Sequence, residues 1–343
     1  MSALDFWRLV YPSGKAPETS RCVAPTAHGI AKEEDVWATA PSLFTREVLS
    51  PEGGILHVTV SDEGARRKSR TCSSHIWSGN LPAASFYQLA DGAFIASPQF
   101  TFLQLAKTLT LIQLIVLGHE LCGLYSFDYR EEFGMKQRET PLITLRQLRD
   151  FLDQAAVSCA FGGSGKKQAP HGMQKAQRAL RYIVERSASP AETAVAMLLT
   201  LPYRLGGYGM SQPAMNQPIV LTGNAAHIAK RRTLKADLLW QDQQLVLEYN
   251  GTGPHSDAAS VLSDRARTSA LQLMGFDVHE ITSEQLFDCA AFEPIALHLA
   301  KLLRKRIPSN ARGSSDARMR LRREVFSWNR AMGRAALAPE LRP

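Results

Sequence analysis

Two acidic residues stand in a segment whose pattern is otherwise that of a buried hairpin. The stretch KADLLWQDQQLVLEYNG, residues 235–251, contains two short apolar runs joined by a polar turn, which predicts two strands. Asp237 lies in the first run and Glu248 in the second. A buried, unpaired carboxylate costs several kcal/mol or shifts its pKa, so both acids need a compensating partner.

The two acids are expected on one face of the hairpin. Side chains alternate across a strand, so Asp237 shares a face with Leu239, and Glu248 shares one with Val246 and Asn250. The opposite face is wholly apolar and consists of Ala236, Leu238, Trp240, Leu245, Leu247 and Tyr249. We expect helices to pack behind the apolar face and an acidic cluster to lie in front.

Neighbouring carboxylates repel unless one is protonated or a cation lies between them. Mg²⁺, or Mn²⁺ in its place, binds carboxylate and carbonyl oxygens, keeps several waters and neutralises charge that develops on a phosphodiester. We therefore predict that Asp237 and Glu248 bind a divalent metal. For Asp237 the structural alternative is an acid at the strand edge, paired with Lys235 or an arginine.

Three nearby segments could complete such a site. Glu192 begins a predicted helix and could supply a third oxygen, although with Ser189 it also fits a purely structural capping box. The glycine-rich turn after Glu248 brings His255 back towards the strand end, where a plain loop position is the alternative. On the next predicted helix Asp264 and Arg267 share a face and could brace the site or meet phosphate, and Arg265 is a candidate DNA contact.

The order of these motifs resembles the very-short-patch-repair-like branch of the PD-(D/E)XK endonuclease superfamily. The motifs are SPAE, KADLLW, LVLEYNG, His255 and DRARTSALQLMGFDVHEIT, within residues 174–303. The resemblance implies a restriction-endonuclease-like fold and Mg²⁺- or Mn²⁺-dependent hydrolysis of DNA. It also implies Glu192, Asp237, Glu248 and the backbone carbonyl of Tyr249 as metal ligands, with His255 transferring a proton or contacting phosphate.

The sequence departs from the motif at Asn250, where the superfamily has lysine and this branch often has aspartate. Asparagine keeps a ligand oxygen but brings no charge and cannot act as a base. His255 or Lys235 would have to activate water instead. A catalytically lapsed domain that regulates transcription by binding DNA is therefore the alternative, and an RNA-directed nuclease is a third.

The positive charge is concentrated at the C-terminal end. The chain has 343 residues and a formal charge of +8; residues 301–343 hold twelve Lys or Arg against three acids, and the preceding residues carry −1. Such a tail indicates a polyanionic partner, here DNA. Its candidate DNA contacts are Arg318, Arg322, Arg323 and Arg330, with Met319 and Phe326 on the same helical stripe. Docking of the tail on the body through Phe326 and Trp328 is the alternative.

Length and composition favour two domains with ordinary cores, since hydrophobic residues make up 45% and charged residues 21%. The sequence FGGSGKKQAP is typical of a linker at 161–170. We predict an α+β recognition or partner domain at 1–160, a nuclease-like domain at 171–306 and a basic tail at 307–343. The nuclease-like domain is expected to be α/β or α+β, a small mixed sheet flanked by helices.

Other patterns limit the class of protein. Five cysteines without a CxxC pair argue against a disulfide framework or zinc knuckle and for a reducing cytoplasm. No signal peptide is evident, and the apolar window 102–117 is too short and polar to span a membrane. GHELCG lacks the second histidine of a zinc-protease motif, so a core helix is expected there. His57, His75 and His119 have no partner spacing and are interpreted as structural.

The N-terminal half shows weaker signals. Strands are expected at 53–62 and in GAFIAS, and a helix capped by Ser97 should run to Gly118 or Gly123, followed by another at 144–155. The segment SHIWSGNLPAASFYQLADGAFIASPQFTFLQLA resembles the central part of AbiEi-type antitoxin proteins. That resemblance implies a defence or toxin–antitoxin setting and a partner protein, but no functional residue is transferred.

The C-terminal half alternates helices and strands around the hairpin. Helices are expected at 174–188, from Ser189 to about Pro202, at 264–275 and at 284–303. The last of these begins at a capping box formed by Thr282 and Gln285. Strands are expected at 217–222 and 275–282 beside the two of the hairpin.

Overall fold

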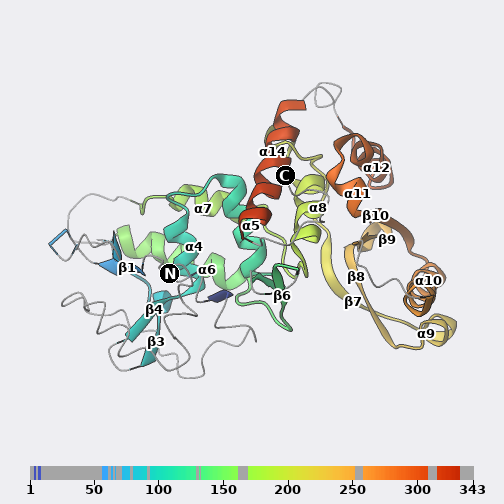
Figure 1. Ribbon diagram of the computed structural model, residues 1–343, viewed down its shortest axis with the longest axis horizontal. Coiled ribbons are helices and arrows are strands. Elements are labelled where there is room, and N and C mark those ends of the chain that lie inside the picture. The colour runs from blue at the N-terminus through green and yellow to red at the C-terminus, as the bar shows by residue number, and fades with distance from the viewer. Residues whose placement is uncertain are drawn as a thin grey trace. The chain divides into compact units, whose positions relative to one another are not determined.

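The chain divides into two compact units (Figure 1). The computed structural model describes residues 4, 7–8, 56–60, 63–64, 66, 72–77, 80–90, 93–128, 131, 133–160, 169–251, 258–307 and 315–332. The first unit comprises Met1–Leu121, Ser126–Asp128 and Lys136–Arg181; the second comprises Cys122–Tyr125, Tyr129–Met135 and Tyr182–Pro343. The main division falls after Arg181, later than the expected linker, most of which lies outside the described residues.

The first unit contains two small sheets. β1 (Leu56–Val60) pairs in parallel with β2 (Cys72–Ile76), and β3 (Phe86–Ala90) pairs antiparallel with β4 (Ala93–Ala96). A 3₁₀ turn, η1 (Ala83–Ser85), precedes β3. A further two-stranded sheet consists of β5 (Tyr125–Phe127) and β6 (Met135–Gln137), whose first residues, Tyr125 and Met135, are assigned to the second unit and the others to the first. The strands expected within 53–62 and in GAFIAS are confirmed.

The helices of this unit are α4 (Pro98–Leu105), α5 (Leu111–Leu121), α6 (Leu145–Ala160) and α7 (Met173–Leu180). Ser97 caps α4 as expected, because its hydroxyl accepts from the Phe100 amide at 3.1 Å. The single helix expected up to Gly118 or Gly123 is wrong. Thr110 and Gln113 form a reciprocal cap that starts a new helix, with the Gln113 amide 3.2 Å from the Thr110 hydroxyl.

The packing of helix α7 explains why the boundary between the units lies after the predicted linker. It ends at Leu180, well short of the expected 188, and packs on α4, α5 and α6. Gly172, at φ +89°, lets the chain pass against the Ala106 backbone, where a Cβ would lie 2.8 Å from a carbonyl carbon. The Lys175 ammonium donates to the Leu109 carbonyl at 2.7 Å. These contacts hold the first helix after the linker in the first unit.

Two sequence patterns of the first unit have definite outcomes. GHELCG is a core helix as expected, because His119 and Glu120 are fully buried in α5. Arg8 donates to both Glu120 carboxylate oxygens, at 2.7 and 2.6 Å. His57 and His75, for which the sequence showed no partner spacing, stack in neighbouring strands with Nδ1 of the former 2.7 Å from Nε2 of the latter.

The second unit is built on a four-stranded mixed sheet of order β10-β9-β8-β7. Its strands are β7 (Ala214–Val220), β8 (Thr233–Trp240), β9 (Leu245–Asn250) and β10 (Asp277–Thr282). β8 is antiparallel to both of its neighbours, β7 and β9, whereas β9 and β10 are parallel. Its helices are α8 (Pro190–Thr200), α9 (Gly223–Ala229), α10 (Ala258–Leu273), α11 (Ser283–Phe287), α12 (Cys289–Leu302) and α14 (Ser315–Met332), with 3₁₀ turns η2 (Tyr203–Leu205) and η3 (Gln241–Gln243). The expected mixed α/β architecture is confirmed, although α9 was not expected.

The hairpin β8–β9 forms where the alternation of apolar residues predicted it. Gln244, at φ +48°, closes the turn after η3. The expectation of an open acidic front is wrong in part. Leu239 and Val246, on the face that carries the acids, are buried in a cluster with Ala270 and Leu271 of α10. Helix α10 therefore covers that end of the face.

The C-terminal helices differ from the sequence prediction in two ways. The capping box of Thr282 and Gln285 is present, but Asp288 caps a second helix by accepting from the Ala290 amide at 2.8 Å, so the expected helix at 284–303 is divided. Helix α14 packs on α8 and η2. Gly206, at φ +93°, permits this approach, since a Cβ there would lie 2.2 Å from the Ala317 carbonyl oxygen. In the part of the chain that is described, no helix is both long and apolar enough to cross a membrane.

Candidate active site

Asp237 and Glu248 lie side by side on neighbouring strands. Leu238 pairs with Leu247, and Asp237 and Glu248 stand one residue beyond this last pair of β8 and β9, within reach of the same guanidinium. The Tyr249 amide donates to Oδ2 of Asp237 at 2.8 Å, which ties the aspartate across the hairpin. The two side chains keep only 19% and 15% of their exposure, so the hairpin buries two carboxylates together.

A guanidinium from α10 reaches both acids. Nη2 of Arg267 donates to Oε2 of Glu248 at 2.7 Å and lies 3.9 Å from Oδ1 of Asp237. The same nitrogen also donates to the Lys235 carbonyl. The second oxygen of Glu248, Oε1, is buried and has no hydrogen-bond partner of ordinary geometry among the described residues. The arginine alternative raised from sequence for Asp237 is thus present, but Arg267 is centred on Glu248.

Glu192 performs the structural role that its capping pattern predicted. The Ser189 hydroxyl accepts from the Glu192 amide at 3.1 Å and donates to Oε1 at 2.9 Å. Oε2 accepts from the Ala188 amide at 2.9 Å and from Nδ2 of Asn216 at 2.7 Å. Three donors hold this carboxylate, and it still lies close enough to Asp237 for the two charges to repel.

The three carboxylates resist ionising together. Burial, reinforced by the charge of Asp237, raises the pKa of Glu248 to about 7 against the opposing pull of Arg267. Burial and the same aspartate raise the pKa of Glu192 to about 7, although its hydrogen bonds oppose the shift. Burial also raises the pKa of Asp237, against the Tyr249 amide and Arg267. The cluster therefore has more negative charge than one guanidinium balances.

The donor chemistry suits a hard divalent cation in part. Asp237 and Glu248 offer carboxylate oxygens on adjacent strands, one of them without a strong donor, as Mg²⁺ or Mn²⁺ requires. Among the residues that the structure describes, no three or more His, Cys, Asp or Glu side chains are grouped closely enough to hold a metal ion. The fit is thus to a two-carboxylate site whose other positions are filled by water or substrate.

The remaining residues of the predicted site lie around this pair. Asn250 is exposed at the end of β9, opposite Thr282. The Tyr249 hydroxyl shares a hydrogen bond of 2.8 Å with the Ser283 hydroxyl, and burial raises the pKa of the tyrosine. His255 and the side chain of Asp264 lie outside the described residues.

The predicted DNA contacts separate into two groups. Arg265 and Arg323 are exposed, whereas Arg318 and Arg322 are only 6% exposed and serve the packing of α14. The prediction that the last two contact DNA is wrong, since their guanidiniums are held inside the unit. The side chain of Arg330 is outside the described residues.

The partners of the two buried arginines show why. Arg318 pairs with Glu293 at 2.6 Å and lies 4.6 Å above the Tyr208 ring. Arg322 donates to the Leu286 carbonyl and lies over the Phe292 ring. Docking of the tail helix, the alternative drawn from sequence, is what the structure shows.

Two residues near the site were missed in the sequence. Asn216 of β7 adopts φ +49° and donates to both Glu192 and the Arg186 carbonyl, the latter at 2.9 Å. No sequence pattern marks it, because its role depends on an unusual backbone conformation. Glu280 of β10 pairs in register with Glu248 and is exposed, and the alternation in DVHEIT could have indicated its face. Comparisons of the chain with protein-family models, with curated proteins and with solved structures gave no match.

Proposed function

We propose that the second unit is a restriction-endonuclease-like domain that hydrolyses DNA phosphodiesters with a divalent metal. The order of its elements supports this. A helix that carries Glu192 precedes the Asp237–Glu248 hairpin, and α10 with Arg267 and the parallel strand β10 follow. This is the order that the sequence resemblance to the PD-(D/E)XK superfamily implies.

One observation carries the proposal: the cross-strand pair Asp237 and Glu248, buried beside a third carboxylate with one guanidinium to balance them. If these residues served packing alone, apolar side chains would serve as well, because replacing a buried ion pair with apolar residues is often neutral or stabilising. Perturbed carboxylates gathered at one end of a hairpin are typical of sites that bind metal and phosphate.

Each residue of this cluster has a part in the proposed reaction. Asp237 and Glu248 would hold the metal, which when bound stabilises charge on the phosphodiester and lowers the pKa of water. Glu192, fixed by Ser189 and Asn216, would add a further negative charge beside Asp237 and so strengthen the attraction for a cation. Arg267 is placed to pass from Glu248 to a substrate phosphate, because a guanidinium binds either anion through the same donors.

Nicking of supercoiled plasmid in Mg²⁺ or Mn²⁺ tests the proposal. Asp237→Asn and Glu248→Gln should each lower the rate by about a hundredfold or more, as loss of a charged group that stabilises the transition state does. Asp242→Asn, at an exposed acid in the turn of the same hairpin, is the control and should leave the rate unchanged. Equal rates in all three variants would refute the assignment of the site.

A DNA-binding regulator without nuclease activity is the second candidate. Asn250 in place of the motif lysine favours it, and so does the ion pair that Arg267 already makes with Glu248. Protein that binds DNA but leaves plasmid intact with either metal would establish this alternative. In both cases we place the protein in the cytoplasm, with the first unit recognising a target or partner protein in a defence or toxin–antitoxin setting.

A further inference from the structure

The connection between β7 and β8, together with the start of β8, carries a cluster of exposed basic side chains. From Thr193 to Ala236 the sequence contains no Asp or Glu. Within that stretch one end of the sheet exposes five basic side chains, here called the basic tip: His227, Lys230, Arg231, Arg232 and Lys235. A cluster of one sign without interspersed acids creates a local positive potential that attracts polyanions.

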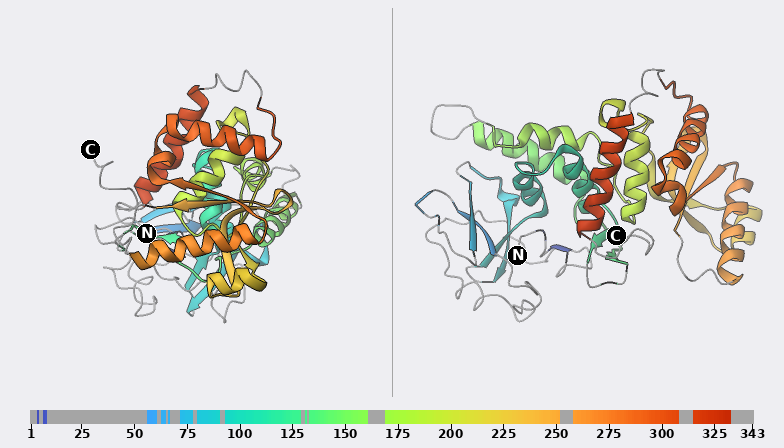
Figure 2. Two further views of the ribbon diagram at one scale, coloured as in Figure 1. Left: turned by 90° about the vertical axis from the view of Figure 1, so that its right-hand side faces the viewer. Right: turned by 45° about the horizontal axis from the view of Figure 1, so that its top comes forward.

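The basic tip is a packed part of the second unit. Leu221 and Ala225 at the start of α9 are buried with Leu234 of β8 and Ala270 of α10. The Thr222 hydroxyl contacts the Met274 sulfur at 3.6 Å. Helices α9 and α10 run beside one another in both views of Figure 2. The basic side chains are therefore held by α9 and the start of β8, which pack against α10. A surface that binds its partner in one orientation requires such a rigid base.

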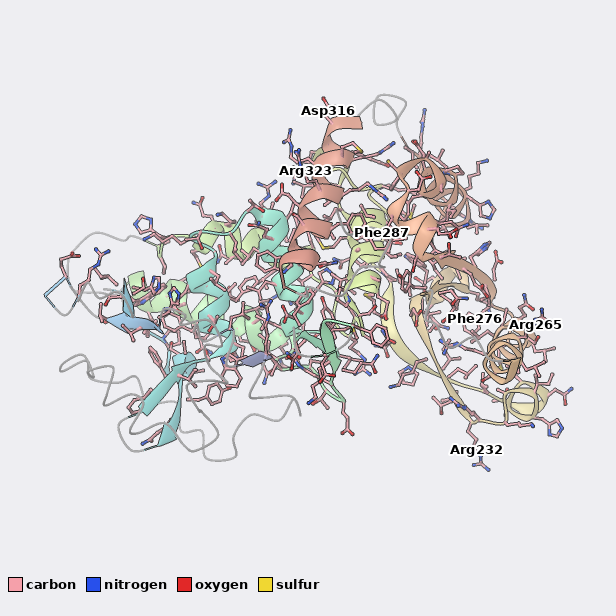
Figure 3. All side chains as sticks on the ribbon, viewed as in Figure 1. Arg232, Arg265, Phe276, Phe287, Asp316 and Arg323 are labelled. Carbon is pink, nitrogen blue, oxygen red and sulfur yellow. The ribbon has the colours of Figure 1, made fainter. Side chains whose placement is uncertain are left out.

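The side chains of the basic tip are exposed. Figure 3 shows Arg232 extending from the connection between β7 and β8, and Arg265 on the neighbouring α10. Arg265 is exposed, and it adds a further cation beside α9. Val220, at 67% exposure, and Leu262, at 65%, leave apolar surface among these charges. Exposed basic side chains in a stretch that has no acid from Thr193 to Ala236 suit the phosphates and sugars of a nucleic-acid backbone.

The strand β8 leads from the basic tip directly to the candidate active site. Lys235 stands two residues before Asp237, so the two side chains point to the same face about 7 Å apart. Arg232 precedes β8 and lies roughly 15 Å from Asp237 along an extended chain. That distance corresponds to about four or five base pairs of duplex DNA, at 3.4 Å each.

We infer that the basic tip docks the phosphate backbone of double-stranded DNA, a few base pairs from a phosphate held at Asp237 and Glu248. This inference rests on the proposed function, because it takes the carboxylate pair as the place of cleavage. The basic tip would fix which phosphate reaches the carboxylates and would supply much of the affinity. An acidic protein partner would satisfy the charges equally but would leave their alignment with Asp237 without a purpose.

The test compares two triple variants that lose the same charge. The first combines Lys230→Gln, Arg231→Gln and Arg232→Gln; the second combines Lys301→Gln, Arg304→Gln and Arg320→Gln, at exposed cations of α12, of the turn that follows it and of α14. Binding of a labelled DNA duplex is measured by fluorescence anisotropy in EDTA over a series of salt concentrations. Thermal melting of each variant checks that the fold is kept.

The first variant should bind roughly tenfold or more weakly, and its slope of log affinity against log salt should fall by about three. The second variant should keep most of the parent's affinity and most of its salt slope. Equal losses in the two variants, no loss in either, no DNA binding by the parent protein, or a preference for duplex RNA would each overturn the inference. Normal binding without nicking refutes only the nuclease activity, whereas normal nicking with an unaffected first variant refutes only the docking surface.

Discussion

Nη2 of Arg267 lies 2.7 Å from Oε2 of Glu248 and 3.9 Å from Oδ1 of Asp237, so one guanidinium from α10 serves two acids of a hairpin. Most of its side chain is covered, with 32% exposed. At such distances the positive charge of Arg267 compensates the two carboxylates in the way that a bound cation would. A metal and Arg267 should therefore compete for Glu248.

Replacing Arg267 should show how much the guanidinium stabilises the carboxylates and whether it competes with a metal for them. Arg267→Ala should lower the free energy of unfolding in EDTA by about 1–3 kcal/mol, because it leaves buried carboxylates without their counter-charge. The variant should then be stabilised more by Mn²⁺ than the parent is, in thermal melts over a metal titration. Arg265→Ala, at an exposed position on the same helix, is the control. An equal effect of metal on all three proteins would contradict competition at this site.

The raised pKa values predict how stability depends on pH. Glu192 and Glu248 have folded pKa values of about 7 against ordinary values of 4.5, so the folded state binds more protons than the unfolded state between these limits. Their stabilising contribution is complete below pH 4.5 and is lost as pH rises through about 7. Metal-free protein should therefore lose on the order of a few kcal/mol of unfolding free energy between about pH 5 and about pH 8.

Denaturant unfolding at a series of pH values measures this loss. Glu192→Gln should flatten the curve, because it removes one titrating group and its repulsion of Asp237. Mg²⁺ should flatten it as well, since a cation favours the charged carboxylates. Stability that rises across this range in EDTA would show that the carboxylates are not held in the protonated state.

The tail helix should be essential to folding. Leu321 is 1% exposed on α14, whereas Met319 on the same helix is 54% exposed. Leu321→Ala should cost about 2–5 kcal/mol in chemical unfolding, and Met319→Ala should change stability by no more than about 0.5 kcal/mol. Deleting residues from 308 onwards should give an aggregated or unfolded second unit. A soluble truncated protein with an unchanged melting temperature would contradict this.

The buried pair Arg8–Glu120 should anchor the first unit. Arg8→Met leaves the Glu120 carboxylate buried without its counter-charge, although the Phe127 amide still donates to it at 3.2 Å, and should cost about 3–5 kcal/mol. Adding Glu120→Leu should recover part of that loss, because two apolar side chains need no counter-charge. Unfolding free energies of the single and double variants measure the recovery. If the double variant is less stable than Arg8→Met alone, the hydrogen bond to Phe127 outweighs the unpaired charge.

Local patterns in the sequence were enough to predict much of the secondary structure of the second unit. The hairpin at 235–251, the caps at Ser189 and Thr282 and the common face of Asp237 and Glu248 follow from alternation and from contacts a few residues apart. The same patterns predicted helices that were too long where a second cap begins a new helix, at Thr110 and at Asp288. The reason is that apolar periodicity continues across the break between the two helices.

The sequence by itself determined on which strands Asp237 and Glu248 lie and that they share a face, since alternation within a strand is a property of the backbone. Only the tertiary structure decided their partners. Arg267 reaches Glu248 because α10 packs on the sheet, and Asn216 reaches Glu192 through a left-handed backbone conformation. Arg318 and Arg322 become core residues because α14 docks, which buries charges that composition alone assigns to a surface. Contacts between residues distant in sequence depend on how the elements pack, and no local pattern encodes that packing.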